Sequence, residues 1–196
     1  MHNDEINLLS QDGEMYYVPH LFNTRESVMF YNALFHGIQW KQQKIKMFGR
    51  ILDMPRLTAW YGDEGKKYSY SNVENIPLPW TETLIEIKEK VEQQAEEAFN
   101  SVLINFYRDG FDSMGWHKDD EKELGLNPVI ASVSFGGTRK FKIKHVNQRE
   151  LKADIELEDG SLLLMRGATQ HYWSHSIPKT MAKVEPRINL TFRNIN

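Results

Sequence analysis

Cysteine is absent from this chain of 196 residues. The protein can therefore form no disulfide framework, thiolate metal site or cysteine nucleophile, and any metal must take nitrogen and oxygen ligands. Long apolar runs are absent too, since none approaches the roughly 20 residues that a bilayer-spanning helix needs. The N-terminal residues lack the basic and apolar regions of a secretory signal, so we expect a cytoplasmic protein, or a nuclear one in a eukaryote, with no membrane partner.

A strong charge of either sign is also lacking, because the formal net charge is −3 at pH 7. Basic residues are nevertheless clustered within residues 41–56 and 139–152. Local patches of this kind can bind nucleic acid, although solvated faces of mixed sign give the same pattern. With 40% hydrophobic and 26% charged residues, the chain has the composition of an ordinary folded protein, and its length predicts one domain over residues 1–196.

Helical periodicity is confined to the first half of the chain. A capping box at Asn23 and Glu26 predicts a helix that ends at Gly37. Its apolar stripe comprises Val28, Tyr31, Leu34 and Phe35. A second helix is predicted from about Thr81, where apolar residues recur every three to four positions.

Short β-rich segments separated by turns follow after about residue 100. They are Val102–Tyr107, Val129–Phe135, Arg139–His145, Ile155–Leu157, Leu162–Met165 and Arg187–Phe192. No helix-length periodic segment separates them, which favours an antiparallel double-sheet barrel or jelly roll over a parallel sheet. The predicted fold class is α+β and mainly β, with helices from the N-terminal half packed on the outside of the barrel.

The most informative pair of residues is His117 and Asp119. In an extended segment, residues two apart point the same way, so an imidazole and a carboxylate can meet at one point. A second histidine would complete a facial triad that leaves three coordination positions open and suits non-haem Fe(II) chemistry. His145, His171 and His175 are candidates, and strand parity does not separate His171 from His175.

The C-terminal segment alternates strictly between apolar and polar residues. Its polar set comprises Arg187, Asn189, Thr191 and Arg193. Arginines on an inward strand face are costly unless anions pair with them, and the two here lie roughly 20 Å apart along a strand. Guanidinium groups reaching inward could therefore bracket a small dicarboxylate, although a polar face in water is the alternative. Asn105 and Tyr107 add an amide and a phenol that share one face of another strand.

These motifs together resemble the AlkB family of Fe(II)/2-oxoglutarate dioxygenases. The likeness extends from about Phe48 to Arg193 and is carried by residues 103–110, 117–121, 131–136, 175–178 and 186–193. It looks closest to the branch that acts on alkylated double-stranded DNA. The resemblance implies a double-stranded β-helix (jelly roll), with residues 101–196 as the catalytic core and 14–100 as a region for nucleotide recognition and helical support.

The resemblance also implies an activity. The cofactors would be Fe(II), 2-oxoglutarate and O2. The reaction would be the oxidative demethylation of N-alkylated bases in DNA, such as 1-methyladenine and 3-methylcytosine, with release of formaldehyde, succinate and CO2. An RNA demethylase with the same chemistry and a catalytically silent nucleic-acid-binding module are the alternatives. We expect a monomer.

Individual residues take roles by the same resemblance. His117, Asp119 and His175 would be the catalytic metal ligands, which leaves His171 a structural or supporting residue. The 2-oxoglutarate site would comprise Asn105, Tyr107, Arg187, Asn189 and Arg193. Arg187 and Tyr107 would hold the distal carboxylate, whereas Arg193 and Asn105 would hold the carboxylate that chelates iron.

The resemblance implies substrate contacts as well. Tyr68 and Tyr70 lie in the segment that stacks on the damaged base, and Asp120 and Glu121 would accept hydrogen bonds from its exocyclic amine. Without the resemblance these two acids would be interpreted as surface residues.

Two further contacts concern the opened duplex. Phe48 would fill the gap that the flipped base leaves, and Arg56 would hold a phosphate or the unpaired strand. A core position is the alternative for Phe48. Lys140, Lys142 and Lys144 share one strand face and suit a surface that contacts phosphates.

Overall fold

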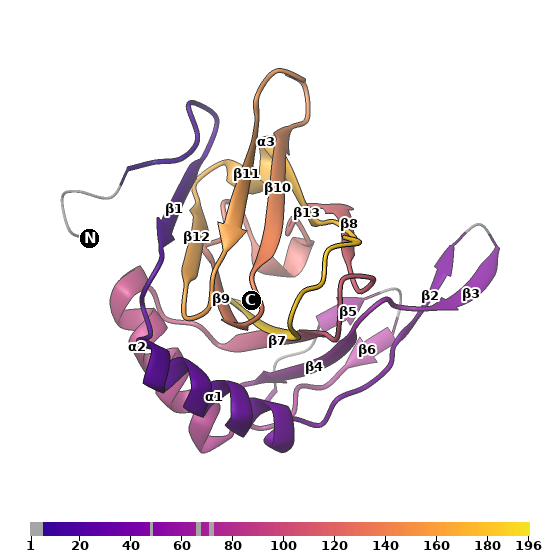
Figure 1. Ribbon diagram of the computed structural model, residues 1–196. Coiled ribbons are helices and arrows are strands. Elements are labelled where there is room, and N and C mark those ends of the chain that lie inside the picture. The colour runs from indigo at the N-terminus through magenta and orange to yellow at the C-terminus, as the bar shows by residue number, and fades with distance from the viewer. Residues whose placement is uncertain (1–5, 48, 66–67, 71–72) are drawn as a thin grey trace.

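The computed structural model describes residues 6–47, 49–65, 68–70 and 73–196, with the backbone alone at 46–47, 68–70 and 73–75. Two β-sheets face each other, and two helices cover the outer face of the larger sheet (Figure 1). A hairpin of β2 and β3 projects away from the barrel. This arrangement confirms the predicted class, a mainly β jelly roll with external helices. Among the described residues, no helix has the length and apolar character needed to cross a membrane.

The elements follow one another in this order: β1 (Glu14–Val18), α1 (Thr24–Gly37), β2 (Lys44–Met47), β3 (Arg50–Asp53), β4 (Leu57–Gly62), β5 (Tyr68–Tyr70), β6 (Val73–Asn75), α2 (Glu82–Ala95), β7 (Ser101–Tyr107), β8 (Met114–His117), a 3-10 turn (Lys122–Leu124), β9 (Ile130–Gly136), β10 (Arg139–His145), β11 (Lys152–Leu157), β12 (Leu162–Arg166), α3 (Thr169–Tyr172), β13 (Trp173–Ile177) and β14 (Arg187–Arg193).

The larger sheet has six strands in the order β1-β12-β9-β14-β7-β4, and the smaller has four in the order β11-β10-β13-β8. Neighbouring strands in both sheets are antiparallel. All six strands expected from the sequence are present. The first half of the chain also supplies both edge strands of the larger sheet, β1 and β4, which the sequence patterns did not predict.

Helix α1 begins with the predicted capping box, since the Asn23 side chain accepts from the Glu26 N–H and the Glu26 carboxylate accepts from the Asn23 N–H. Its predicted buried stripe is partly wrong. Val28 is 54% exposed and Phe35 40%, whereas Phe30 is only 6% exposed. The helix is rotated because the Phe30 ring packs in an aromatic cluster with the Phe22 and Phe135 rings.

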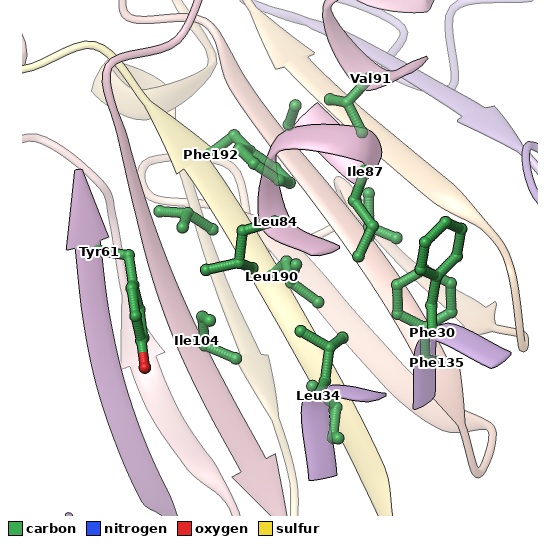
Figure 2. Close-up of a cluster of buried hydrophobic side chains, with 14 of the residues drawn as sticks. Phe30, Leu34, Tyr61, Leu84, Ile87, Val91, Ile104, Phe135, Leu190 and Phe192 are labelled. Carbon is green, nitrogen blue, oxygen red and sulfur yellow. The ribbon is translucent and has the colours of Figure 1, made fainter. Parts of the chain in front are cut away.

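Helix α2 packs on the outer face of the larger sheet, as its periodicity predicts. Its buried residues are Leu84, Ile87, Val91 and Ala95. They meet Ile104 of β7 and Leu190 and Phe192 of β14 in one apolar layer (Figure 2). Burial of these side chains is the main stabilising contribution to this half of the fold.

Strand β14 separates this apolar layer from the barrel interior. Ile188, Leu190 and Phe192 face the helices, and the alternate residues face the smaller sheet. In register with them lie Tyr107 and Asn105 of β7, opposite Arg187 and Asn189 respectively. The inward face of the larger sheet therefore carries the alternate polar residues of β14 together with Asn105 and Tyr107 of β7.

Candidate active site

A cluster of metal-ligating side chains lies where β8 and β13 pair. The register places His175 directly opposite His117, and Asp119 follows two residues later. One ligand atom from each of the three residues lies within 4.8 Å of the other two. The structure thus brings together the three residues that the sequence suggested, from two strands and the segment after β8.

The other two candidate histidines lie elsewhere. His171 is exposed on α3, and its Nε2 lies 2.8 Å from Asn127 Oδ1. His145 is buried, but its Nδ1 accepts backbone N–H bonds from Asn147 and Gln148. Neither imidazole faces the cluster, and the sheet register selects His175 where strand parity did not.

The charge state of the cluster suits a divalent cation. Burial alone would raise the pKa of Asp119, but the charges of Arg193, His175 and His117 outweigh burial and hold this pKa below its ordinary value. Burial and the neighbouring His117 lower the pKa of His175 to about 3, although Asp119 opposes the shift. An ionised carboxylate and a neutral imidazole are the forms that bind metals.

Hydrogen bonds orient the ligand atoms. His117 Nδ1 lies 2.9 Å from the Gly115 carbonyl oxygen, so Nδ1 carries the proton and Nε2 keeps a free lone pair. His175 Nε2 lies 3.5 Å from Asp119 Oδ2, and its buried Nδ1 has no hydrogen-bond partner in the described part of the chain. Two imidazoles and one carboxylate, with no thiolate, form a donor set that fits Fe(II).

Asp119 is itself held by two residues. Gln170 of α3 accepts a hydrogen bond from the Asp119 N–H at 2.9 Å, and Arg193 donates to Oδ1. Gln170 is buried, and sequence reasoning missed it because the short helix α3 carries no periodic pattern. Arg193, expected at the co-substrate end nearest the metal, lies beside the cluster.

Arg187, at the other end of β14, is only 1% exposed. Its Nη2 donates to Ser134 Oγ at 2.9 Å, and its guanidinium carbon lies 5.3 Å from the centre of the Tyr107 ring. The Nε and Nη1 atoms of Arg187 are buried, and neither donates a hydrogen bond to any of the described residues. Burial lowers the pKa of Arg187 to about 10, so the group stays charged at neutral pH and needs an anion.

The two asparagines of the expected co-substrate site differ in their partners. Asn189 Nδ2 donates to Ser132 Oγ at 2.8 Å and to the Val133 carbonyl at 2.9 Å. Asn105 Oδ1 accepts from Arg56 Nε at 2.8 Å. The acceptor of Asn105 is thereby occupied, which leaves its NH2 group as the side that can donate to a carboxylate.

The position of Arg56 differs from the expectation. It is 4% exposed and also donates to the Ser113 carbonyl, so its guanidinium lies inside the protein. A buried group held by two acceptors does not suit a contact with a phosphate on the outside of a nucleic acid. Arg56 instead lines a cavity of about 300 Å3 next to the metal-ligand cluster.

This cavity lies between β4 and the segment that follows β8. Its lining includes His117, Asp119 and Glu121, together with Arg56 and, from β4, Thr58 and Trp60. Its volume is at the lower end of the range of ligand sites. A small ring system bound in this cavity would lie against His117 and Asp119, two of the metal-ligating residues.

The residues expected to contact substrate lie in different places. Glu121 lines the cavity, whereas Asp120 is exposed and its carboxylate lies 2.6 Å from Lys118 Nζ. Phe48 lies outside the described residues, as do the side chains of Tyr68 and Tyr70, whose backbone forms β5.

The three lysines of β10 are already engaged within the smaller sheet. Lys142 Nζ lies 2.9 Å from Asp154 of β11, and Lys140 lies 3.6 Å from the same carboxylate. Lys144 Nζ is 4.1 Å from the centre of a Trp116 ring. Ion pairing between β10 and β11 reduces the positive charge of this face, and of the three lysines only Lys144 contacts a ring rather than a carboxylate among the described residues.

Comparison with known proteins identifies the family of this chain. A model of the 2OG-Fe(II) oxygenase superfamily matches residues 14–193. The chain therefore belongs to the 2OG-Fe(II) oxygenase superfamily, whose cofactors are Fe(II), 2-oxoglutarate and O2. Within it, the chain is 40% identical over 186 residues to the alpha-ketoglutarate-dependent dioxygenase alkB homolog 3 of Mus musculus, covering 90% of this chain and 64% of that protein.

Other relatives extend the comparison. The DNA oxidative demethylase ALKBH2 of Mus musculus is 40% identical over 159 residues, 78% of this chain and 66% of that protein. The solved structure of OsALKBH1 matches with a TM-score of 0.63 and 17% identity over 92% of this chain and 96% of that one. The resemblance to the AlkB family is confirmed. The chain spans slightly less than two thirds of the length of each of these two curated relatives.

Proposed function

We propose that this chain is an Fe(II)/2-oxoglutarate-dependent dioxygenase that demethylates N-alkylated bases in DNA, such as 1-methyladenine and 3-methylcytosine. The observation that carries the proposal is the cavity with His117 and Asp119 in its wall, in a chain with about 40% identity to a protein named a DNA oxidative demethylase. The dimensions of this cavity suit one flipped base better than a paired one.

His117, Asp119 and His175 would hold the metal. When bound, Fe(II) would supply the activation of O2. 2-Oxoglutarate would be converted to succinate and CO2, and the methyl group of the base would be released as formaldehyde. The protein orients the reactants and keeps the buried centre free of bulk water. Asp119 is fixed from both sides, by Gln170 and Arg193, and so presents its carboxylate in one orientation.

The polar face of β14 would bind 2-oxoglutarate. Arg187 and Tyr107 would pair with the distal carboxylate, and the unsatisfied Nε and Nη1 of Arg187 would supply hydrogen-bond donors. Arg193 and the NH2 group of Asn105 would hold the end that chelates the metal, and Asn189 lies opposite Asn105 in the neighbouring strand.

The base would enter from the β4 side of the cavity. Glu121 is placed to accept a hydrogen bond from an exocyclic amine, and Asp120 becomes available once its ion pair with Lys118 opens. Tyr68 and Tyr70 would stack on the base, and Phe48 would fill the gap in the duplex.

The test is reconstitution with Fe(II) under anaerobic conditions, followed by air, 2-oxoglutarate and matched DNA and RNA oligonucleotides that carry 1-methyladenine or 3-methylcytosine. We expect loss of the methyl mass from DNA, dependent on both iron and 2-oxoglutarate, and no loss with Asp119→Ala. Faster turnover of the RNA oligonucleotides than of the DNA oligonucleotides would identify RNA as the preferred substrate. Absence of turnover on every oligonucleotide by iron-loaded protein would overturn the proposed activity and leave a binding role.

We propose in addition that the enzyme acts as a monomer, in the cytoplasm or, in a eukaryote, in the nucleus. The proposed metal site has a complete set of ligands, His117, Asp119 and His175, within this chain. Light scattering during size-exclusion chromatography should give the mass of one chain, and a dimer mass would contradict this.

A further inference from the structure

Tyr107 lies close to two buried guanidinium groups, and only one of them belongs to the proposed co-substrate site. The guanidinium carbon of Arg187 lies 5.3 Å from the centre of the Tyr107 ring, and that of Arg139 lies 5.6 Å from it. Arg139, the first residue of β10, is 3% exposed. Both distances fall within the range of cation–π contacts.

Arg139 is held rigidly by backbone oxygens. Nη1 donates to the Asp109 carbonyl at 3.0 Å, and Nη2 donates to the carbonyls of Asp112 at 2.9 Å and Pro178 at 2.8 Å. The first two carbonyls belong to the loop that joins β7 to β8, and Pro178 directly follows β13. One guanidinium thus connects the strand that carries Tyr107 with the two strands that carry the histidine ligands.

The charge around Tyr107 is unbalanced. Among the described residues no carboxylate pairs with Arg187. The carboxylates near Arg139 are those of Asp109 and of Asp112, and Asp112 is also ion-paired with Arg108. Two buried cations near one phenol repel each other unless an anion is bound between them. The side chains around Tyr107 therefore form a site with excess positive charge at the end of β14 that lies away from Asp119 and Arg193.

We propose that Arg139 is a positioning residue for the distal carboxylate of the 2-oxo acid. It holds the Tyr107 ring in place beside Arg187 and adds a second fixed cation, so the site selects 2-oxo acids that carry a second carboxylate. This inference rests on the proposed function and deepens it.

The experiment compares two co-substrates on protein loaded with Mn(II), with binding measured by calorimetry. One is 2-oxoglutarate, and the other is 2-oxopentanoate, which has a methyl group in place of the distal carboxylate. Arg139→Met should raise the Kd of 2-oxoglutarate about tenfold or more, because charge-assisted contacts are lost at a buried site. The Kd of 2-oxopentanoate should change less than about twofold, since it lacks the group on which Arg139 acts.

Arg139→Lys keeps the charge but cannot reach three carbonyls at once, and we expect a smaller loss that is again confined to 2-oxoglutarate. The matched control is Arg166→Met, since Arg166 also donates to a backbone carbonyl, that of Ala95 at the end of α2. It should lower the midpoint of thermal unfolding without changing either Kd.

Equal weakening of both co-substrates by the Arg139 variants would assign the residue a structural role only and overturn the inference, as would no weakening of either. If Arg139→Met does not fold, the test rests on whether Arg139→Lys weakens binding of 2-oxoglutarate more than binding of 2-oxopentanoate. A failure of wild-type protein to bind 2-oxoglutarate at all would instead contradict the proposed function, so the two failures are distinguishable.

Discussion

His117 and His175 face each other across the antiparallel pair of β8 and β13, with their ring centres 4.2 Å apart. The Phe141 ring stacks on His175 at 5.1 Å and leaves it little freedom to rotate. The proposed metal site is therefore assembled by the register of the smaller sheet, and it depends on the pairing of two short strands.

The first prediction concerns the choice of histidine. His175→Ala should abolish Fe(II) binding and reduce demethylation by more than about a hundredfold, because loss of a ligand exceeds the usual effect of a supporting residue. His171→Ala should stay within about twofold of wild type, since His171 is exposed and its Nε2 lies 2.8 Å from Asn127 Oδ1 rather than at the metal-ligand cluster. Metal content by atomic absorption and turnover by mass spectrometry check both variants. The reverse pattern would falsify the assignment of His175.

A second prediction concerns Gln170, which accepts a hydrogen bond from the Asp119 N–H. Gln170→Ala should weaken Fe(II) affinity by about 10- to 100-fold, because the Asp119 carboxylate loses part of its orientation. Titration with Fe(II) under anaerobic conditions measures the affinity. An unchanged affinity together with a lowered melting temperature would mean that Gln170 only stabilises the fold.

Arg56 offers a third test, because its buried side chain binds Asn105. Arg56→Ala should weaken 2-oxoglutarate binding and leave the salt dependence of DNA binding as it is. A lost phosphate contact would instead reduce the slope of log K against log salt by about one. Fluorescence anisotropy at several salt concentrations distinguishes the two roles.

A fourth prediction tests which face of α1 is buried. Phe30→Ala should lower the free energy of unfolding by about 3–5 kcal/mol, because it opens a cavity in the aromatic cluster. Val28→Ala should change it by less than about 0.5 kcal/mol, since Val28 lies largely in solvent. Urea denaturation measures the free energy of unfolding of both variants. Equal decreases would mean that Val28 is buried, as the sequence pattern predicted.

The fifth prediction concerns pH and Asp112. Burial alone would raise the pKa of Asp112, but hydrogen bonds from Arg108, and the charges of Arg108 and Arg139, hold it below the ordinary value of 3.8. The unfolded chain then binds the proton more readily, so this contribution to stability is present above the ordinary pKa and is lost as pH falls through the lowered one.

Asp112→Asn should therefore cost about 1–3 kcal/mol near neutral pH, and the difference from wild type should shrink on acidification to about pH 3. Urea denaturation at both pH values measures the difference. A difference that is constant across this range would show that the charge of Asp112 contributes nothing.

The sequence predicted six of the eight strands of the second half, because turns bound those apolar segments and β14 alternates without exception. It did not include β8 and β13, the short strands that carry His117 and His175, among them. It could not choose between His171 and His175, because that choice depends on which strand lies beside β8. It missed β1 and β4 since edge strands carry weak patterns, and it misplaced the buried face of α1 since Val28 and Phe30 are both apolar.

The same limit applies to the site. Residue spacing suggested the polar face of β14 and the pair of His117 and Asp119, and the resemblance to a known family decided between these interpretations and their alternatives. Gln170, Arg139 and the interior position of Arg56 do not follow from residue spacing, because each depends on contacts between segments far apart in the chain. Polar residues of this kind show no periodicity that identifies their partners.

Strand β14 has a consequence for how this chain can change over time. One face of it packs against the helices, and the other carries the arginines of the proposed co-substrate site. Deletion or insertion of a single residue in the strand would exchange the two faces, placing Leu190 in the active site and a guanidinium in the apolar layer. The length of this segment therefore cannot change by one residue without disturbing both the apolar layer and the proposed co-substrate site.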